Sequence, residues 1–309
     1  MIPGTALIAT VYQEGAGIRP WLEALAAQTA APEDFIIVDG ASTDDTVAQI
    51  TNFPWPTGFP KPRVIVERCN IAAGRNIAIQ NTIQPIIIST DAGSRPEPAW
   101  LEKMVAPLVG NLQIDVVGGE SIFLLRNEFQ KSLAPYLGAG PVSSETVMPS
   151  SRCVAFRREA WAAVGGYPEW LTLTAEDTLF NYNLRAAGLR FHYASDAIVA
   201  WEVRPTLKAF LKMIYHYGYG WAEARFWPRQ HLRWLATILC PPLILLSRNS
   251  LRDVPFRFRR NLAGAAGWLM GTIFGHRPPP GWSMRDGILL SPETLRFLSE
   301  KARKTEAVS

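Results

Sequence analysis

Apolar runs and amphipathic stretches alternate over the first third of the chain. Two stretches, 18–29 and 43–50, have the spacing of apolar residues that is typical of helices, and the second begins with polar residues that favour a helix N-terminus. The runs between them are nearly continuous in Ile and Val, which indicates strands covered on both faces. The pattern predicts an α/β fold in which a parallel or mixed sheet lies between two layers of helices. The predicted strands are residues 6–12, 34–40, 63–67, 85–90 and 114–119.

Beyond residue 150 the helical pattern is stronger. A short strand is expected from Cys153, followed by a helix over 175–187 that carries Glu176 and Asp177 at its first turn. Carboxylates are favoured there by the helix dipole. A further helix is expected to begin at Pro205, because proline suits the first position of a helix.

Basic charge and apolar stretches occur together near the C-terminus. The net charge of the chain is +4, yet residues 204–277 contain twelve Arg or Lys and only two acidic residues. The apolar stretches 234–246 and 262–275 are shorter than the roughly 20 residues that a membrane-spanning helix needs. Arginines alternate with Phe and Trp around them, as in segments that lie at a membrane interface. Residues 227–277 are therefore predicted to bind a membrane surface; the alternative is a helical subdomain packed on the sheet.

Several classes of protein are disfavoured by the patterns that the sequence lacks. The three cysteines are far apart and have no CxxC spacing, which argues against a disulfide framework or a thiolate zinc site. The N-terminus has no signal-peptide pattern, so a cytoplasmic location is expected. No GxGxxG follows the first strand, where Glu14 would repel the pyrophosphate of a dinucleotide. A nucleic-acid partner is not expected, because no RNA groove requires apolar stretches among the basic residues.

Acidic side chains stand at the ends of three predicted strands. Glu14 follows the first strand, Asp39 ends the second and Asp91 follows the fourth. In a sheet of this kind, ligands bind beyond the carboxyl ends of the strands. These carboxylates are therefore the first candidates for a functional site.

Five phrases, taken in order, resemble the family 2 inverting glycosyltransferases of GT-A fold. They are TVYQEG, IIVDGASTDDT, CNIAAGRNIAI, IISTDAGSRPEPAWLEKM, and VGGYPE followed by TAEDTLF. The resemblance covers about residues 6–219 and implies a GT-A catalytic domain over 1–226, built on a mixed, mostly parallel sheet with helices on both faces. This domain would have a nucleotide-binding half, 1–119, and an acceptor half, 120–226. A basic, aromatic and apolar helical region, 227–309, would follow it and associate with the inner face of the cell membrane.

The resemblance implies transfer of a sugar from a nucleotide-diphosphate donor to a hydroxyl acceptor. A UDP-sugar is the donor that it favours. The acceptor would be a carbohydrate, a lipid-linked sugar or a growing envelope polysaccharide. The donor would be bound by Glu14, Asp39, Arg75, Asp91 and Arg152. Asp39 would accept the N3 hydrogen of a pyrimidine base, unless it only caps the next helix. Arg75 would reach the base or the diphosphate, since a guanidinium binds phosphate in two-pronged fashion, unless it is a surface arginine on a helix.

Asp91 stands where the family has an Asp-x-Asp motif that binds Mg²⁺ or Mn²⁺ across the donor phosphates. Hard cations prefer carboxylate and phosphate oxygens together. Here the third position of the motif is Gly93, so the second carboxylate is missing. Either Asp91 holds the metal with Ser94, waters and phosphates, or arginines neutralise the diphosphate; a third interpretation is that Asp91 caps a helix near 97–109. The arginines in question are Arg75, Arg95 and Arg152.

Glu176 and Asp177 resemble the acidic pair of the family, in which the Asp is the general base. Inverting transfer needs a base, because the acceptor hydroxyl must lose its proton as it attacks the anomeric carbon. Asp177 is predicted to be that base, with a pKa raised by crowding, and Glu176 to bind the acceptor or to orient the pair. The alternative is a pair of exposed acids at a helix N-terminus. Ser150, Ser151 and Trp170 are further candidates for lining the sugar or acceptor pocket.

A non-catalytic function is the alternative that the incomplete motif leaves open. A weakened relative could bind nucleotide sugars as a membrane-associated module. Such a protein could keep Asp39 and Asp91 and would not need Asp177. The convergence of all three on one pocket is the cheapest observation that separates the two functions.

Overall fold

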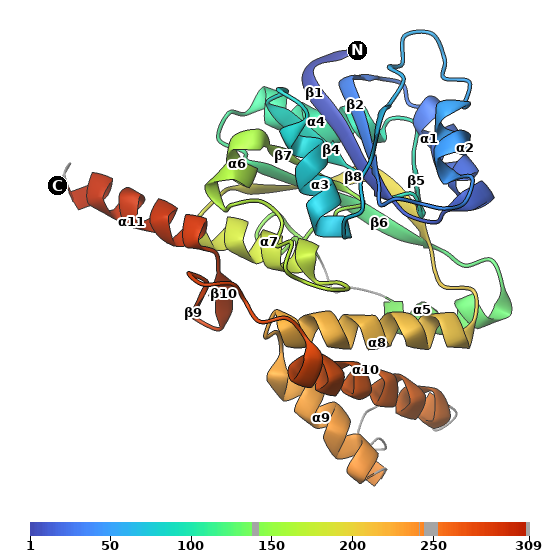
Figure 1. Ribbon diagram of the computed structural model, residues 1–309, viewed down its shortest axis with the longest axis vertical. Helices are drawn as coiled ribbons and strands as arrows, with labels where there is room; N and C mark the ends of the chain where they lie inside the picture. The colour runs from blue at the N-terminus through green and yellow to red at the C-terminus, as the bar shows by residue number, and fades with distance from the viewer. Residues whose placement is uncertain (138–141, 241, 244–252, 307–309) are drawn as a thin grey trace.

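A mixed eight-stranded sheet forms the centre of the computed structural model, which describes residues 1–137, 142–240, 242–243 and 253–306 (Figure 1). The strands are β1 (Ile2–Val11), β2 (Pro32–Asp39), β3 (Arg63–Val66), β4 (Ile86–Ser89), β5 (Ser94–Pro96), β6 (Val116–Leu124), β7 (Val154–Arg157) and β8 (Phe191–Glu202). Their order across the sheet is β3-β2-β1-β4-β7-β6-β8-β5. The pairs from β3 to β4 and the pair β6 and β8 are parallel, whereas β7 and β5 run antiparallel to their neighbours. The predicted mixed sheet is confirmed.

Two strands of this sheet, β5 and β8, have no counterpart in the sequence prediction. β5 has only three residues, too few for a pattern. β8 has twelve residues, but polar positions such as His192 and Asp196 interrupt it, and several of its side chains are partly exposed. It pairs with β5 on one side and with β6 on the other. A strand that is buried along only part of its length gives no continuous apolar run.

Helices cover both faces of the sheet. They are α1 (Arg19–Ala26), α3 (Ile71–Gln80), α4 (Trp100–Gly110), α6 (Arg158–Ala163) and α7 (Glu176–Ala186). On β1, Leu7 packs into the core with α1 and α4, whereas the next residue, Ile8, packs with α3, α6 and α7. At Gly74 of α3 a Cβ would lie 2.6 Å from Cγ2 of Thr10, so glycine permits the close approach of α3 to β1. The prediction of a sheet with helices on both faces is confirmed.

The first helices begin later than predicted. A 3₁₀ turn, Gly15–Ile18, precedes α1, and α2 (Thr46–Thr51) begins three residues beyond Thr43. The Asp44 carboxylate accepts hydrogen bonds from the backbone N–H and the hydroxyl of Thr46, at 3.1 and 2.6 Å. Local side-chain bonds of this kind compete with helical ones and delay the helix start.

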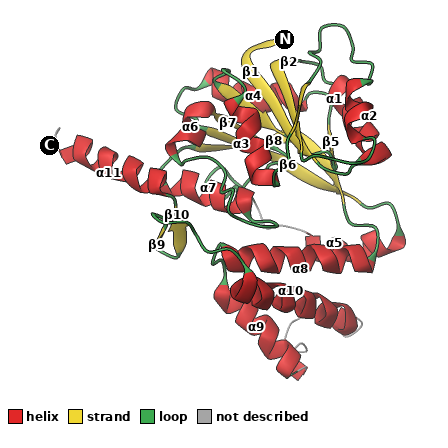
Figure 2. Ribbon diagram, in the orientation of Figure 1, coloured by secondary structure: helices red, strands yellow, loops and turns green. Residues whose placement is uncertain are grey.

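A layer of three helices lies beside the carboxyl edge of the sheet. It comprises α8 (Leu207–Glu223), α9 (Pro228–Leu239) and α10 (Val254–Phe274), and Figure 2 shows it as helix separated from the strands. Glycines allow α8 and α10 to pack closely, since a Cβ at Gly267 would lie 2.0 Å from the carbonyl oxygen of Tyr215. The layer meets the rest of the chain through α5 (Glu128–Leu137) and through the loop before α7. Pro205 lies just before α8, whose N-cap is Thr206.

The chain returns from this layer to the main body. A hairpin of β9 (Ser283–Arg285) and β10 (Ile288–Leu290) leads to α11 (Pro292–Glu306), which contacts α6 and α7. Among the described ranges, no helix combines the length and the apolar character needed to cross a bilayer. Part of the apolar stretch 234–246, namely residue 241 and residues 244–246, lies outside the described residues.

Candidate active site

Two adjoining cavities open beyond the carboxyl ends of β1 and β4. The α7 cavity, about 380 Å³, is lined by α3, α8 and the first turn of α7, and the β8 cavity, about 400 Å³, by the segments after β1, β4 and β8. Ile71, Asp91, Arg152 and Tyr217 line both, so one ligand can extend from the first into the second. A smaller β2 cavity, about 150 Å³, lies at the ends of β1 and β2 and shares Glu14 with the β8 cavity.

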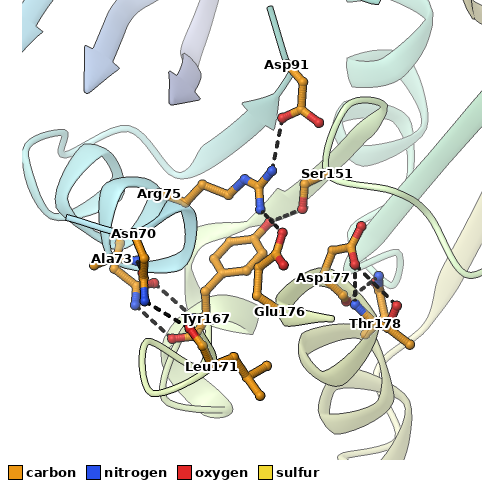
Figure 3. A network of polar contacts seen from close by, with 12 residues as sticks. Asn70, Ala73, Arg75, Asp91, Ser151, Tyr167, Leu171, Glu176, Asp177 and Thr178 are labelled. Atoms are coloured by element: carbon orange, nitrogen blue, oxygen red, sulfur yellow. Dashed lines mark hydrogen bonds and ion pairs between the residues drawn. The ribbon is translucent and has the colours of Figure 1, made fainter. Parts of the chain in front are cut away.

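Arg75 joins two of the predicted carboxylates. Its side chain is 2% exposed; Nη1 donates to Oε1 of Glu176 at 2.6 Å and Nη2 to Oδ1 of Asp91 at 2.9 Å (Figure 3). The guanidinium also lies 5.4 Å from the centre of the Tyr167 ring. Burial alone would lower the pKa of Arg75, but Asp91 and Glu176 raise it above its usual value, so the group stays charged. The alternative of a surface arginine is therefore wrong.

The acidic pair at the start of α7 is divided between two environments. Glu176 is buried, whereas Asp177 is half-buried and lines the α7 cavity. Burial raises the pKa of Glu176, and Asp177 raises it further, against the opposing charge of Arg75. Oδ1 of Asp177 accepts the N–H and hydroxyl of Thr178 at 2.7 and 3.2 Å. The pair is thus not two exposed acids, and Oδ2 of Asp177 is the oxygen left available to a ligand.

Asp91 offers a divalent cation a single free oxygen. Oδ1 is engaged by Arg75, and the hydroxyl of Ser94 donates to the backbone oxygen of Asp91 at 2.6 Å and is fully buried. Ser94 therefore does not complete a metal shell as expected. No three His, Cys, Asp or Glu side chains gather around a possible metal position within the described chain. The residues fit a cation that arrives with donor phosphates rather than one held in a cage of protein ligands.

The same geometry excludes Asp91 as a helix cap. The helix in question, α4, begins at Trp100, and its N-cap is Ala99. Asp91 lies instead at the junction of the α7 and β8 cavities.

The β8 cavity contains charges of both signs. Burial raises the pKa of Glu14 above its ordinary value, against the opposing charge of Arg204. Arg152 lies 4.4 Å from the ring centre of Trp201, and neither Arg152 nor Arg204 has an ion-pair partner within the described residues. Arg95 is more restrained, because it donates to two backbone oxygens. Two unpaired guanidinium groups in one cavity suit an anionic ligand.

Asp39 lies apart from the two larger cavities. Its carboxylate is fully buried and accepts the N–H and hydroxyl of Ser42, at 2.7 and 2.6 Å. It does not cap α2, whose N-cap is Asp45. Its neighbours Val38 and Gly40 line the β2 cavity. The structure therefore brings Asp91 and Asp177 together in the α7 cavity. The expected convergence of all three carboxylates on one pocket is wrong for Asp39, which lies beside the β2 cavity because it ends the neighbouring strand β2.

The remaining predicted site residues divide into those that line a cavity and those that do not. Ser150 and Arg152 line the α7 cavity, whereas Ser151 is buried and its hydroxyl donates to the Tyr167 hydroxyl at 3.2 Å. Trp170 lines none of the three cavities and packs against Trp282.

Several cavity residues carry no site signal of their own in the sequence, among them Tyr217, Trp221 and Arg204. Tyr217 and Trp221 of α8 line the α7 cavity with their rings stacked 5.6 Å apart, and Arg204 lines the β8 cavity. Trp221 appears in the sequence only as part of an apolar helical stripe, which is the pattern of core residues. Arg204 begins the segment in which basic residues are concentrated, and this concentration is the feature of the sequence that points to it.

Comparisons with known proteins identify the family to which the chain belongs. The profile of Glycosyl transferase family 2 matches residues 6–164, and that of Glycosyl transferase family group 2 matches residues 91–272. The chain belongs to glycosyl transferase family 2, and the expectation of a GT-A member of that family is confirmed.

Two curated relatives are O-antigen chain rhamnosyltransferases. The chain is 26% identical to WbaN of Salmonella anatum over 218 residues, which are 64% of this chain and 66% of that protein. It is 23% identical to RfbN of Salmonella typhimurium over 207 residues, which are 62% of this chain and 64% of that protein. The match thus spans just under two thirds of the length of each relative.

Solved structures share the fold at low sequence identity. The mannosyltransferase PcManGT from Pyrobaculum calidifontis, solved with GDP-Man and Mn²⁺, aligns with a TM-score of 0.55 at 16% identity, over 98% of this chain and 80% of that one. S. aureus TarS 1–349, solved with UDP, aligns with a TM-score of 0.50 at 15% identity, over 92% of this chain and 95% of that one.

Proposed function

We propose that the protein is an inverting glycosyltransferase that moves a sugar from a nucleotide diphosphate to a hydroxyl. The observation that carries the proposal is the placement of Asp91 and Asp177 in one cavity, with the buried Arg75 and Glu176 between them. Membership of glycosyl transferase family 2 supports the reaction class.

Asp177 is the general base in this proposal. Its free Oδ2 takes the proton of the acceptor hydroxyl while the acceptor oxygen forms a bond to the anomeric carbon. The bond between that carbon and the phosphate oxygen breaks on the opposite face, and the nucleoside diphosphate leaves with the electron pair. Glu176 binds Arg75, and Arg75 binds Asp91, so ion pairs link the helix turn that carries the base to the diphosphate end of the cleft.

The donor extends along the β2 and β8 cavities. Its base occupies the β2 cavity beside Asp39, with a UDP-sugar as the first candidate, and its diphosphate lies in the β8 cavity near Glu14, Arg152 and Arg204. Oδ2 of Asp91 would hold Mg²⁺ or Mn²⁺ together with the phosphates. Such a cation would neutralise charge on the leaving diphosphate. The unpaired arginines supply the same neutralisation from the protein side.

A donor screen tests the reaction. Hydrolysis of UDP-, GDP- and dTDP-sugars is measured with Mn²⁺, with Mg²⁺ and with EDTA, for the native chain and for Asp177→Asn. Turnover of one donor by the native chain, lost in the variant, supports the proposal. Binding of a nucleotide without turnover of any donor overturns it and favours the alternative, a nucleotide-sugar binding module.

The acceptor occupies the α7 cavity against Tyr217 and Trp221. Aromatic rings of this kind suit the apolar faces of sugars. The acceptor is a carbohydrate or a lipid-linked sugar, and the names of the two relatives favour envelope polysaccharide. Nucleic acid has no part in the proposal.

We propose in addition that α10 rests on an anionic bilayer at the inner face of the cell membrane. Leu262, Leu269 and Ile273 lie on one face of α10 by helical spacing and are 45%, 46% and 59% exposed. Phe274 at the end of the helix is 65% exposed. The helical layer that contains α10 also carries exposed arginines, which fit lipid headgroups of negative charge; they are Arg225, Arg229, Arg233 and Arg259.

Sedimentation with vesicles tests the membrane proposal. The double variant Ile273→Ser, Phe274→Ser should lose binding to phosphatidylcholine vesicles that contain phosphatidylglycerol. The matched control is Ile83→Ser, since Ile83 is 88% exposed and lies between α3 and β4, two elements that Figure 1 shows away from α10. Equal binding of the native chain and the double variant overturns the proposal.

A further inference from the structure

A buried carboxylate on α8 ties together three segments that are distant in the sequence. Glu223 is 3% exposed, and its Oε1 accepts the hydroxyl of Thr172 at 2.6 Å and the backbone N–H of His276 at 2.7 Å. Its Oε2 accepts the backbone N–H of Thr172 at 2.9 Å. Thr172 stands in the loop before the acidic pair, and His276 follows α10. Glu223 therefore connects that loop with both main helices of the C-terminal layer.

The same loop is held against α8 at two further points. The hydroxyl of Thr174 donates to the backbone oxygen of His216 at 2.9 Å. A Cβ at Gly220 would lie 2.4 Å from the backbone oxygen of Thr174, so glycine permits the contact. The loop then ends at Ala175, whose φ of 79° lies in the left-handed region. A non-glycine residue keeps this conformation only where its surroundings impose it.

We propose that Glu223 is a positioning residue for sugar transfer. It holds residues 172–175 so that α7 begins at Glu176 and the free oxygen of Asp177 faces the α7 cavity. It acts through Thr172 and lines none of the three cavities. The inference rests on the proposed role of Asp177 as the base.

The geometry requires a carboxylate rather than any buried polar group. Three donors converge on its two oxygens, and a carboxylate is an acceptor at both. In Glu223→Gln one end becomes an NH₂ donor that faces an N–H or O–H donor, so at least one bond is lost. The substitution keeps the size of the side chain, so packing of α8 is retained.

Hydrogen exchange tests the positioning without any substrate. In Glu223→Gln the amides of residues 172–175 should exchange at least about tenfold faster than in the native chain, as expected for loss of a hydrogen bond to a charged group. Amides of β1 and α3 should be unchanged. Unchanged exchange in the loop overturns the proposal, whatever the donor of the enzyme proves to be.

Kinetics with the donor from the screen test the consequence. We expect kcat of Glu223→Gln to fall by about 10- to 100-fold, because a small displacement of a base is costly, while KM for the donor stays within a few-fold. In Thr172→Val, which removes only the hydroxyl bond, kcat should fall less than in Glu223→Gln. In the double variant the two decreases in kcat should not add. Faster exchange in the loop with a native kcat overturns the positioning role. A rise in KM for the donor as large as the fall in kcat overturns it as well.

Thr294→Val is the matched control. Its hydroxyl is fully buried and donates to Oδ1 of Asn183 at 2.9 Å, in the second half of α7 and not in the loop of residues 172–175. It should lower the stability to urea without changing kcat. Loss of kcat in this variant comparable with that in Glu223→Gln would show that a general loss of stability explains both. The exchange experiment needs no substrate, so its result does not depend on whether the proposed reaction is correct. A failure of the proposed reaction is therefore distinguishable from a failure of this inference.

Discussion

The two walls of the cleft are built by different means. On the sheet side, polar residues stand at the ends of β1, β2 and β4, so the ladder hydrogen bonds of buried strands set the position of Glu14, Asp39 and Asp91. On the helix side, α8 supplies Tyr217 and Trp221, and its place depends on side-chain contacts with α10 and with the loop before α7. A strand end is positioned by backbone bonds that many sequences can make, whereas a helix wall depends on the particular residues that pack it.

The difference assigns separate tasks to the two walls. The sheet wall lies along the cavities proposed for the nucleotide, and the helix wall lies along the cavity proposed for the acceptor. Arg75 of α3 links the two walls, because it pairs with Asp91 of the sheet wall and with Glu176 at the start of α7. Damage to one wall should therefore leave the other functional unless Arg75 itself is changed.

The largest expected effect is on turnover in Asp177→Asn. Loss of a general base should lower kcat by about 10²- to 10⁴-fold, whereas nucleotide affinity should stay within a few-fold because the sheet wall is intact. Single-turnover assays and calorimetry with the nucleotide measure the two quantities. A parallel loss of nucleotide affinity would contradict the division of tasks.

Arg75→Met should damage both walls. It leaves Asp91 and the buried Glu176 without their shared counter-charge, so the free energy of unfolding should fall by about 3–5 kcal/mol. Denaturation in urea measures this loss. The control is Arg63→Met, which breaks an exposed ion pair with Asp34 and should cost less than about 1 kcal/mol. Equal effects of the two variants would show that the buried network adds nothing.

Gly267→Ala should disturb the helix wall alone. The new Cβ would lie 2.0 Å from the backbone oxygen of Tyr215, and overpacking of this kind costs about 1–3 kcal/mol. Amide exchange in α8 and α10 should rise, with nucleotide binding unchanged. Gly110→Ala is the control, because its Cβ would meet no atom within 4 Å. Loss of nucleotide binding in Gly267→Ala would contradict the independence of the walls.

The smallest effect concerns pH and Glu176. The pKa of this carboxyl is raised above its ordinary value of 4.5, so between that value and the raised one the folded state binds more protons than the unfolded state. The contribution of Glu176 to the free energy of unfolding then falls as pH rises through this window. Glu176→Gln lacks the titrating group, so native stability relative to this variant should decline as pH rises above about 4.5. If the stability of the native chain relative to Glu176→Gln instead rose with pH, the charge of Arg75 would have a larger effect on the pKa of Glu176 than burial has.

Much of the fold and part of the cleft follow from local pattern. The Ile and Val runs at 34–40 and 85–90 predict two central strands, and the acidic residues at their ends follow from the rule for such sheets. The β8 strand is missed because polar and partly exposed positions interrupt its apolar pattern, and its pairing with β6 and β5 joins distant segments that the local sequence does not reveal. Asp39 illustrates the limit within the site, since only the structure shows its carboxylate bonded to Ser42.

By itself the sequence determined the alternation of strands and helices, the acidic residues at the strand ends and the family to which the chain belongs, because each depends on neighbours in the chain or on spacing along it. Only the tertiary structure decided that Arg75 is a buried counter-charge, that Tyr217 and Trp221 form a wall and that Glu223 holds the loop before Asp177. Those relations join residues as many as 101 positions apart, and packing of whole elements sets the distances between them.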